Sequence, residues 1–429
     1  MSAYFFDTKV KSFLAGFFMV SIFIVHIKIL PLEAETQPIL SLAVALALFS
    51  LASKRYFSSV DFIFLSLFFL YLSLLTVIIF FLRGGAGAFV LLFKYTMGPV
   101  FFMAVIMIAK NIRPAYLFFV VLVFVLLAML YVVDSSTEIL INEVLTGRVN
   151  THGRPNFFTP EPSYFVYLYA PVICLSYFFH LKGSLNGKMF FLLTTSVTMC
   201  GLLTVSSYQY VFLALFSTSL FFLFSWKGRL GLAVVLLFIV IVLLTFSNAI
   251  NRLSSLFSVM YLYFYGDIGW DFIVYKMDPS ASTRVLINYI AFSSGFENLG
   301  FGSLGVGFSD YWASRAVHLG INIEAHEVLR SVSISEPQTY LSNLIYDYGL
   351  FPTVLVILFF GYTFFIACRH GKYAYSRRQK RTFNAFMIFS LGAIFFLLFF
   401  QGAVSSPALW VILGLVRSSK NIFFNERFV

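Results

Sequence analysis

Residues 60–82 have the sequence VDFIFLSLFFLYLSLLTVIIFFL, in which Asp61 is the only charged side chain. An α-helix rises about 1.5 Å per residue, so an apolar run of this length reaches across a hydrocarbon layer about 30 Å thick. In lipid, a helix also satisfies its backbone hydrogen bonds within the segment. The run therefore predicts a helix that spans a membrane.

Similar apolar runs recur along the whole chain. Of its 429 residues, 60% are hydrophobic, 20% aromatic and 11% charged, and the mean hydropathy is +0.91, whereas a soluble domain has about 25% charged residues. The sequence predicts an all-α integral membrane protein with about twelve transmembrane helices, which form one polytopic domain over residues 1–429. The predicted spans lie near residues 12–32, 38–53, 60–82, 88–109, 115–133, 163–180, 189–205, 210–225, 230–247, 350–367, 383–401 and 406–416. The first run is too long for a signal-peptide core and no cleavage site follows it, so we expect it to remain as an anchor.

The net charge of +11 follows a pattern along the chain. Alternate gaps between the apolar runs are basic, and the gap from Arg369 to Arg381 is the richest in Lys and Arg. The short gaps on the other side carry only Arg83, Arg148 and Arg154. The positive-inside rule then predicts that both termini lie in the cytoplasm. Because orientation accounts for the basic residues, we do not expect nucleic acid as a partner.

Two segments on the predicted outer side are long enough to carry out chemistry, residues 134–162 and residues 248–337. In the first, Pro160 and Pro162 flank Glu161, which favours extended backbone at Glu161 and suits Pro162 to the first position of a helix. A carboxylate at that position is stabilised by the helix dipole. One interpretation is that Glu161 only caps the helix and pairs with a neighbouring arginine at the level of the lipid headgroups.

The second segment contains SASTRVLINYIAFSSG, which has apolar residues at helical spacing. Ser282 or Thr283 is expected to cap this helix, with Arg284 in its first turn and Gly295 at its C-terminal end. The glycines of GFGSLGVG, residues 300–307, match a dinucleotide-binding pattern. That pattern requires a preceding strand in a βαβ unit, which this sequence does not predict, so we expect a flexible or closely packed loop.

The arginines of the two outer segments suggest that an anion binds there. The planar guanidinium binds phosphate oxygens bidentately and can stabilise a pyrophosphate as it leaves. We interpret Arg154 and Arg284 as pyrophosphate clamps, with Arg148 and His152 as secondary substrate contacts. Glu161 is then either the general base for a sugar hydroxyl that attacks the anomeric carbon, or the partner of an arginine.

The other ionisable residues give weaker indications of function. Lys94 lies inside an apolar run, where an ionisable group is a functional hypothesis by default, so it joins the substrate-binding candidates. Snorkelling to the headgroups or pairing with another helix is the alternative. No metal is expected, because His318 and His326 have no third ligand at a compact spacing. The three cysteines lie inside or at the ends of apolar runs, which does not indicate a disulfide framework.

The segment RPNFFTPEPSYF, residues 154–165, resembles the Arg…Glu-Pro-Ser segment that precedes a transmembrane helix in O-antigen polymerases of the Wzy type. Arg284 and Gly295 are similar to the Arg-x10-Gly pattern of an outer loop in the same family. The companion Arg-x15-Gly pattern is absent. Related O-antigen ligases carry a histidine eleven positions before a glycine, whereas this sequence has Gln338 at that spacing before Gly349, which favours a polymerase over a ligase.

The resemblance implies an enzyme that polymerises undecaprenyl-pyrophosphate-linked oligosaccharide repeat units by glycosyl transfer, at the periplasmic face of a bacterial inner membrane. Donor and acceptor are both lipid-linked, and neither a metal nor a nucleotide cofactor is implied. Gln338 is expected to contact a sugar, and a chain-length regulator and a flippase are further implied partners. An O-antigen ligase and a transporter or flippase of lipid-linked oligosaccharide remain as alternatives.

Overall fold

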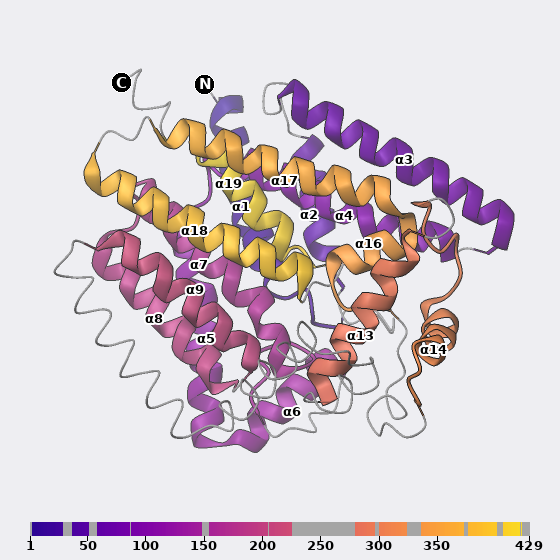
Figure 1. The fold of residues 1–429 in the computed structure, drawn as a ribbon. Helices are drawn as coiled ribbons and strands as arrows, with labels where there is room; N and C mark the ends of the chain where they lie inside the picture. The colour runs from indigo at the N-terminus through magenta and orange to yellow at the C-terminus, as the bar shows by residue number, and fades with distance from the viewer. Residues whose placement is uncertain are drawn as a thin grey trace.

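The computed structural model consists of helices joined by turns, with no strand among the residues it describes (Figure 1). These residues are 2–28, 37–50, 58–85, 87–147, 154–204, 206–224, 279–296, 300–323, 336–372, 376–400, 406–420 and 422. The described helices are α1 (Ser2–Ile22), α2 (Ile39–Ser50), α3 (Ser59–Arg83), α4 (Gly87–Ile108), α5 (Pro114–Val133), α6 (Ser135–Thr146), η1 (Pro162–Phe165), α7 (Val166–Leu181), α8 (Gly187–Leu203), α9 (Ser207–Leu223), α13 (Pro279–Ser294), α14 (Phe308–His318), α16 (Tyr340–Tyr348), α17 (Leu350–Gly371), α18 (Arg377–Phe399) and α19 (Ala408–Ser418).

Six of these helices are long and apolar enough to cross a membrane. They are α3, α4, α5, η1 with α7, α17 and α18. Shorter apolar helices occur in α1, α2, α8, α9 and α19. Every predicted span therefore overlaps a described helix, except residues 230–247, which lie outside the described residues. The prediction of an all-helical membrane protein is confirmed, and the number of twelve crossings stays a prediction.

The first predicted span is wrong in its position. Helix α1 begins at Ser2 and ends at Ile22, whereas the apolar run suggested residues 12–32. Beyond Ile22 the backbone turns, and the N–H of Lys28 donates to the carbonyl of Leu145 in α6 at 2.8 Å. The apolar composition of the run gives no signal for this turn, because its polar backbone groups find partners in another segment.

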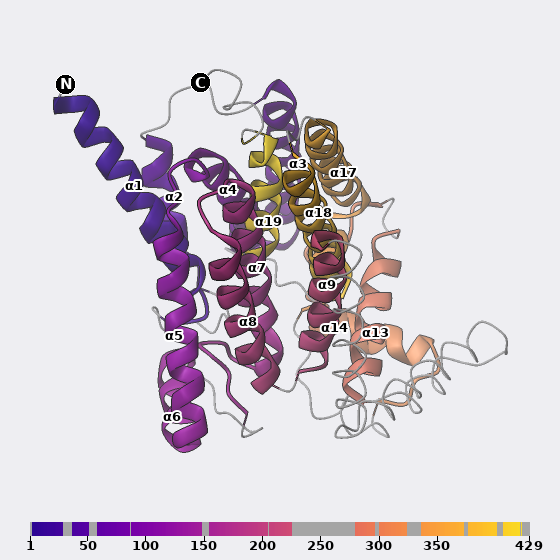
Figure 2. The same ribbon diagram turned by 90° about the vertical axis from the view of Figure 1, so that its left-hand side faces the viewer.

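Helix α7 lies at the centre of the bundle. All its side chains from Val166 to Phe179 are buried, and it contacts α5, α8, α9, α18 and α19. Two views at right angles place α6 and α13 at the end of the molecule opposite the beginning of α1 (Figures 1 and 2). Helix α7 therefore lies at the centre of the bundle, with α6 and α13 at one end of the molecule and the beginning of α1 at the other (Figures 1 and 2).

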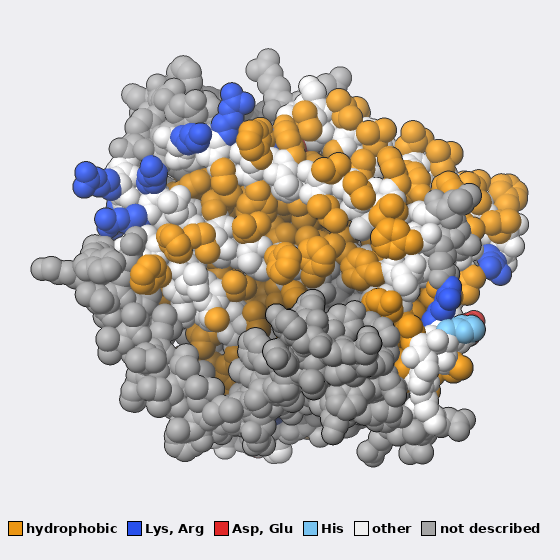
Figure 3. Space-filling model, viewed as in Figure 1, with side chains coloured by type: hydrophobic (Ala, Val, Ile, Leu, Met, Phe, Trp, Pro, Cys, Tyr) orange, Lys and Arg blue, Asp and Glu red, His pale blue; other side chains and the backbone are white. Residues whose placement is uncertain are grey.

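The outer faces of the peripheral helices are apolar. On α17 and α18 the exposed large side chains include Leu358, Phe365, Leu391 and Phe395, and this face of the molecule is largely hydrophobic (Figure 3). Exposed apolar surface of this extent suits contact with lipid. Lys and Arg side chains gather at the edge of the same face, where α17 ends and α18 begins (Figure 3).

The gaps predicted to be cytoplasmic meet at one end of the bundle. The ammonium of Lys182, after α7, donates to the carbonyl of Lys110, before α5, at 2.7 Å. The guanidinium of Arg378, at the beginning of α18, lies beside Gly187, at the beginning of α8. These contacts agree with the prediction that successive membrane helices run in opposite directions. The side of the membrane on which this end lies stays a prediction.

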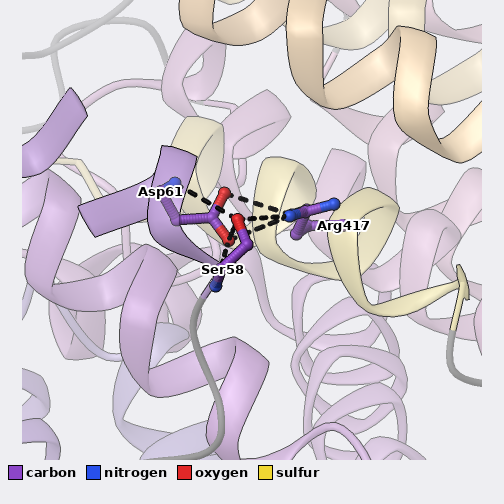
Figure 4. Close-up of polar contacts among 3 residues, drawn as sticks. All are labelled: Ser58, Asp61 and Arg417. Atoms are coloured by element: carbon purple, nitrogen blue, oxygen red, sulfur yellow. Dashed lines mark hydrogen bonds and ion pairs between the residues drawn. The ribbon is translucent and has the colours of Figure 1, made fainter. Parts of the chain in front are cut away.

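A buried ion pair joins the beginning of α3 to the end of α19 (Figure 4). Nε of Arg417 donates to both carboxylate oxygens of Asp61 at 3.2 and 3.3 Å, and Nη2 donates to Oδ2 at 2.9 Å. Nη2 also donates to the hydroxyl of Ser58 at 2.9 Å. The side chains of Arg417 and Asp61 are only 3% and 2% exposed. Because Ser58 and Asp61 also form the capping box of α3, one set of polar groups both starts that helix and fixes α19 against it.

We expect Arg417→Met to lower the free energy of unfolding by about 3–5 kcal/mol, because it leaves the Asp61 carboxylate buried without its cation. Asp61→Leu combined with Arg417→Met should recover most of this loss, since no uncompensated charge remains. Unfolding of the detergent-solubilised protein, followed by circular dichroism, measures both effects. Arg381→Met, at an exposed position of α18, is the control. Equal stability of Arg417→Met and the control would contradict the structural role of the pair.

Candidate active site

The beginning of the central helix has the backbone that the prolines predict. Glu161 is extended, with φ −141° and ψ 151°, and Pro162 occupies the first turn of η1, which continues directly into α7. The missing N–H of a proline costs nothing in the first turn of a helix. Glu161 is therefore held by stiff backbone at one end of a helix that is buried along nearly its whole length.

Helix capping does not account for the Glu161 carboxylate. Its side chain accepts no N–H from the first turn of η1, and the hydroxyl of Ser163 donates to Oε2 at 3.3 Å. Arg154 is half-buried, and its Nη1 donates to the carbonyl of Thr204, at the end of α8, at 3.5 Å. Glu161 thus lies just before η1 and α7 begin and Arg154 lies where α8 ends, and both side chains retain exposed surface.

Helix α6 holds this segment in place. Buried Glu138 accepts from the side-chain amide of Asn142 at 2.6 Å, and Oδ1 of Asn142 accepts from the backbone N–H of Phe158 at 2.7 Å. Phe157 and Phe158 have φ values of 48° and 64°, which are unfavourable for bulky residues. Such a backbone persists only where its surroundings fix it. The sequence analysis missed Glu138, because no spacing pattern indicates which acidic residue of a loop is buried.

Burial raises the pKa of the Glu138 carboxyl to about 7, although the backbone N–H groups of Phe157 and Asn156 act in the opposite direction. The neutral acid is therefore favoured in the folded protein at mildly acidic pH. Glu138 lies in α6, outside the six helices that are long and apolar enough to span a membrane.

Helix α13, which carries Arg284, begins earlier than predicted. It starts at Pro279, so Ser282 and Thr283 lie inside the helix and cannot cap it, and Arg284 lies in the second turn. Proline is well suited to a first helical position, and this preference outweighed the expected hydroxyl cap. The chain turns directly after Ser294, where the N–H of Gly295 donates to the carbonyl of Phe292 at 3.2 Å, so the predicted C-terminal end is confirmed.

The structure brings α13 together with the segment that contains Gln338. Oδ1 of Asn288 accepts from the backbone N–H of Gln338 at 3.2 Å and from the hydroxyl of Ser342 at 2.8 Å. Asn288 follows Arg284 by four residues, about one helical turn. Arg284 therefore belongs to the stretch of α13 that lies against the beginning of α16.

Lys94 and Asp347 belong to the same region. The ammonium of Lys94 pairs with the carboxylate of Glu336, two residues before Gln338. The neighbouring hydroxyl of Tyr95 donates to Oδ2 of Asp347 at 2.7 Å. The sequence analysis missed Asp347. One feature of the sequence could have indicated it, because Asp347 is the only charged residue between residues 337 and 368.

The glycine-rich loop packs against the junction of α16 and α17. The N–H of Ser303 donates to the carbonyl of Tyr346 at 2.6 Å. A Cβ at Gly302 would overlap that carbonyl, and a Cβ at Gly349, whose φ is 85°, would overlap the carbonyl of Gly300. The glycines thus permit close backbone contact, which accounts for their spacing without a nucleotide.

The predicted site residues form two groups. Lys94, Gln338 and the helix of Arg284 come together at α16, whereas the hydrogen bonds described for Arg154 and Glu161 run to Thr204 and Ser163. Helix α19 lies between the two groups of residues. It packs against α7, and its Trp410 ring lies 6.1 Å from the ring of Tyr340 in α16. Arg148 and His152 lie outside the described residues.

The part of the chain that the structure describes contains no cluster of three His, Cys, Asp or Glu side chains that could hold a metal ion. Its polar groups at this end are guanidinium, ammonium, carboxylate, amide and phenol groups. These groups can bind an anion, bind sugar hydroxyls and accept a proton.

The fold defines a helical integral membrane protein. No protein-family model matches the chain, and no curated protein matches it. Its function therefore has to be argued from the arrangement of its own residues.

We expect the stability of the wild-type protein to fall as the pH rises from about 4.5 to about 7, because a raised carboxyl pKa favours folding most below the pKa of the unfolded chain. Glu138→Gln should remove this contribution. The stability of the variant minus that of wild type should therefore be larger at pH 8 than at pH 5. Melting temperatures at the two pH values measure the effect. Glu143→Gln, on the same helix, is the control. An unchanged pH dependence in Glu138→Gln would show that the carboxyl is not perturbed.

Proposed function

We propose that the protein polymerises undecaprenyl-pyrophosphate-linked oligosaccharide repeat units into O-antigen or a related surface polysaccharide, on the periplasmic face of a bacterial inner membrane. The observation that carries this proposal is the position of Glu161 at the beginning of the central helix and of Arg154 at the end of α8, on backbone stiffened by proline and by the contacts of α6. A lipid-linked substrate presents its pyrophosphate and sugars at the membrane surface, and we assign these side chains to that depth on the periplasmic side as part of the proposal.

The proposed reaction joins two lipid-linked glycans. A hydroxyl of the acceptor sugar attacks the anomeric carbon of the donor, the bond from that carbon to the pyrophosphate oxygen breaks, and undecaprenyl pyrophosphate leaves with the electron pair. Negative charge grows on the pyrophosphate in this step, so fixed guanidinium groups stabilise the transition state more than the ground state. The proton of the attacking hydroxyl passes to a carboxylate.

The residues take the following roles in this proposal. Arg154 and Arg284 bind the pyrophosphate, and Arg148 and His152 are secondary contacts. Glu161 is the general base or orients Arg154. The region of α16 supplies the sugar contacts, for which its amide groups and the Lys94–Glu336 pair are suited.

A transporter or flippase of lipid-linked oligosaccharide is the second candidate. Lys94, which pairs with Glu336, is the observation that favours it, because a charged group within a membrane helix often marks a transport pathway. An O-antigen ligase is the third candidate, and Gln338 is the observation against it, since an amide cannot replace the histidine base of the related ligases.

We expect Arg284→Lys to collapse the surface glycan from long chains to single repeats, because lysine keeps the charge but loses the bidentate fork. The measurement is the glycan ladder on a gel from cells whose only copy of the gene carries the change, at a verified protein level in the membrane. Arg315→Lys, on α14 of the same outer segment, is the matched control.

The remaining outcomes separate the candidates. A wild-type ladder from both variants would remove Arg284 from the site. Loss of even the single capped repeats would indicate ligation or transport, since polymerisation is not needed to display one repeat.

A further inference from the structure

Four polar side chains meet where α4 passes α16. Tyr95 and Lys94 are consecutive residues of α4, Asp347 is the last residue but one of α16, and Glu336 precedes that helix. Tyr95 bonds to Asp347 and Lys94 pairs with Glu336, and the charges of Lys94 and Glu336 both act on Asp347. These contacts join four ionisable groups into one cluster.

The cluster lies beside the first half of α4 and is accessible. Lys94 lies seven residues into α4, about 10 Å from the beginning of that helix. The side chains of Lys94 and Glu336 are 28% and 55% exposed, and Asp347 is half-buried. A substrate group that reaches below the outer ends of α3 and α4 can therefore contact the cluster.

Surrounding contacts fix the position of Asp347. The hydroxyl of Tyr348 bonds to that of Thr76 in α3 at 3.0 Å, and the hydroxyl of Tyr71 donates to the carbonyl of Tyr348 at 3.2 Å. The Tyr95 ring also packs edge to face against the Tyr348 ring at 5.1 Å. Helix α16 is thus tied to both α3 and α4 at the residue next to Asp347.

The charges of the cluster suit a sugar better than a pyrophosphate. Two carboxyl groups share one ammonium, so the cluster repels a polyanion once both carboxyl groups are ionised. Sugar hydroxyls both donate and accept hydrogen bonds, and carboxylate and amide groups supply the matching partners. The amide of Asn288 on α13 lies against the same α16 segment, which places the helix of Arg284 beside the cluster.

We propose that Asp347 is the general base of the glycosyl transfer, held by Tyr95, and that the cluster around it binds the acceptor sugar. This inference rests on the proposed polymerase function. The acceptor hydroxyl gives its proton to Asp347 as its oxygen bonds to the anomeric carbon, and the pyrophosphate leaves from the opposite side with the electron pair of the broken bond. Asp347 then releases the proton to water. Glu161 is left to orient Arg154.

The hydrogen bond from Tyr95 makes the two oxygens of Asp347 unequal. Oδ2 accepts the hydroxyl of Tyr95 and is the less basic of the two, so Oδ1 is favoured to take the proton of the acceptor hydroxyl. Tyr95 is therefore a positioning residue, which acts through Asp347.

The test measures initial rates of polymer formation in membrane vesicles that contain the host's own lipid-linked repeat units and one protein variant. Asp347→Asn keeps the shape but accepts no proton, so we expect kcat to fall about 100-fold or more with KM within about threefold of wild type. Asp347→Glu should restore part of kcat. Tyr95→Phe should lower kcat about tenfold, since it loosens only the position of the base. Tyr177→Phe, which loses a buried hydroxyl bond to Ser219 between α7 and α9, is the matched control and should stay within about threefold of wild type.

Each outcome decides a different point. Polymerisation by wild type with undiminished kcat in Asp347→Asn would overturn the assignment of Asp347 and leave the polymerase function standing. A large loss of kcat in Glu161→Gln together with a small one in Asp347→Asn would return the role of base to Glu161. If Asp347→Asn does not reach the membrane, equal rates for Tyr95→Phe and Tyr177→Phe overturn the proposal. No polymer from wild-type vesicles would overturn the proposed function itself, and this inference with it.

Discussion

The ion pair between Asp61 and Arg417 is the interaction on which the arrangement of the bundle depends. It lies at a position where neither charge has access to water, so each group is tolerable only because the other is present. The two residues belong to α3 and to α19, the first long apolar helix and the last helix of the described chain. Helix α19 in turn contacts α4, α7, α17 and α18. A single polar contact thus specifies how the second half of the chain closes onto the first.

The same central helices organise the opposite end of the molecule. Helices α7 and α19 pack side by side, and the groups proposed to bind pyrophosphate and sugar lie around the beginnings of both helices. The site residues come from segments far apart in the sequence, but each is attached to a helix within the bundle. Glu161 directly precedes η1 and the central helix, and Asp347 lies two residues before Gly349, at the junction with α17. A rigid frame of this kind can hold two substrates in one orientation, which is a large part of catalysis between bound reactants.

The sequence predicted the helices well where composition alone determines them. Runs such as residues 60–82 have no stable alternative in lipid, and the proline pair around Glu161 restricts the backbone locally. The turn after Ile22 was not predictable, because it ends at Lys28, whose N–H bonds to Leu145 of α6, a partner that no local pattern reveals. Asp347 and Glu138 were missed for the same reason, since their environment is created by tertiary contacts, with Tyr95 for Asp347 and with the backbone of Asn156 and Phe157 for Glu138. The roles of Arg148 and His152 remain predictions from the sequence.

The contact between Gly349 and Gly300 has a mechanical consequence. Backbone touches backbone there, with no flexible side chain between the two segments to absorb a displacement. Helix α17 begins at the next residue, and transmembrane helices tilt in response to the thickness of the bilayer. A change in the tilt of α17 is therefore passed directly to the glycine loop, which follows closely after α13 in the chain. Through this junction, the lipid composition of the membrane can alter the geometry of the outer site.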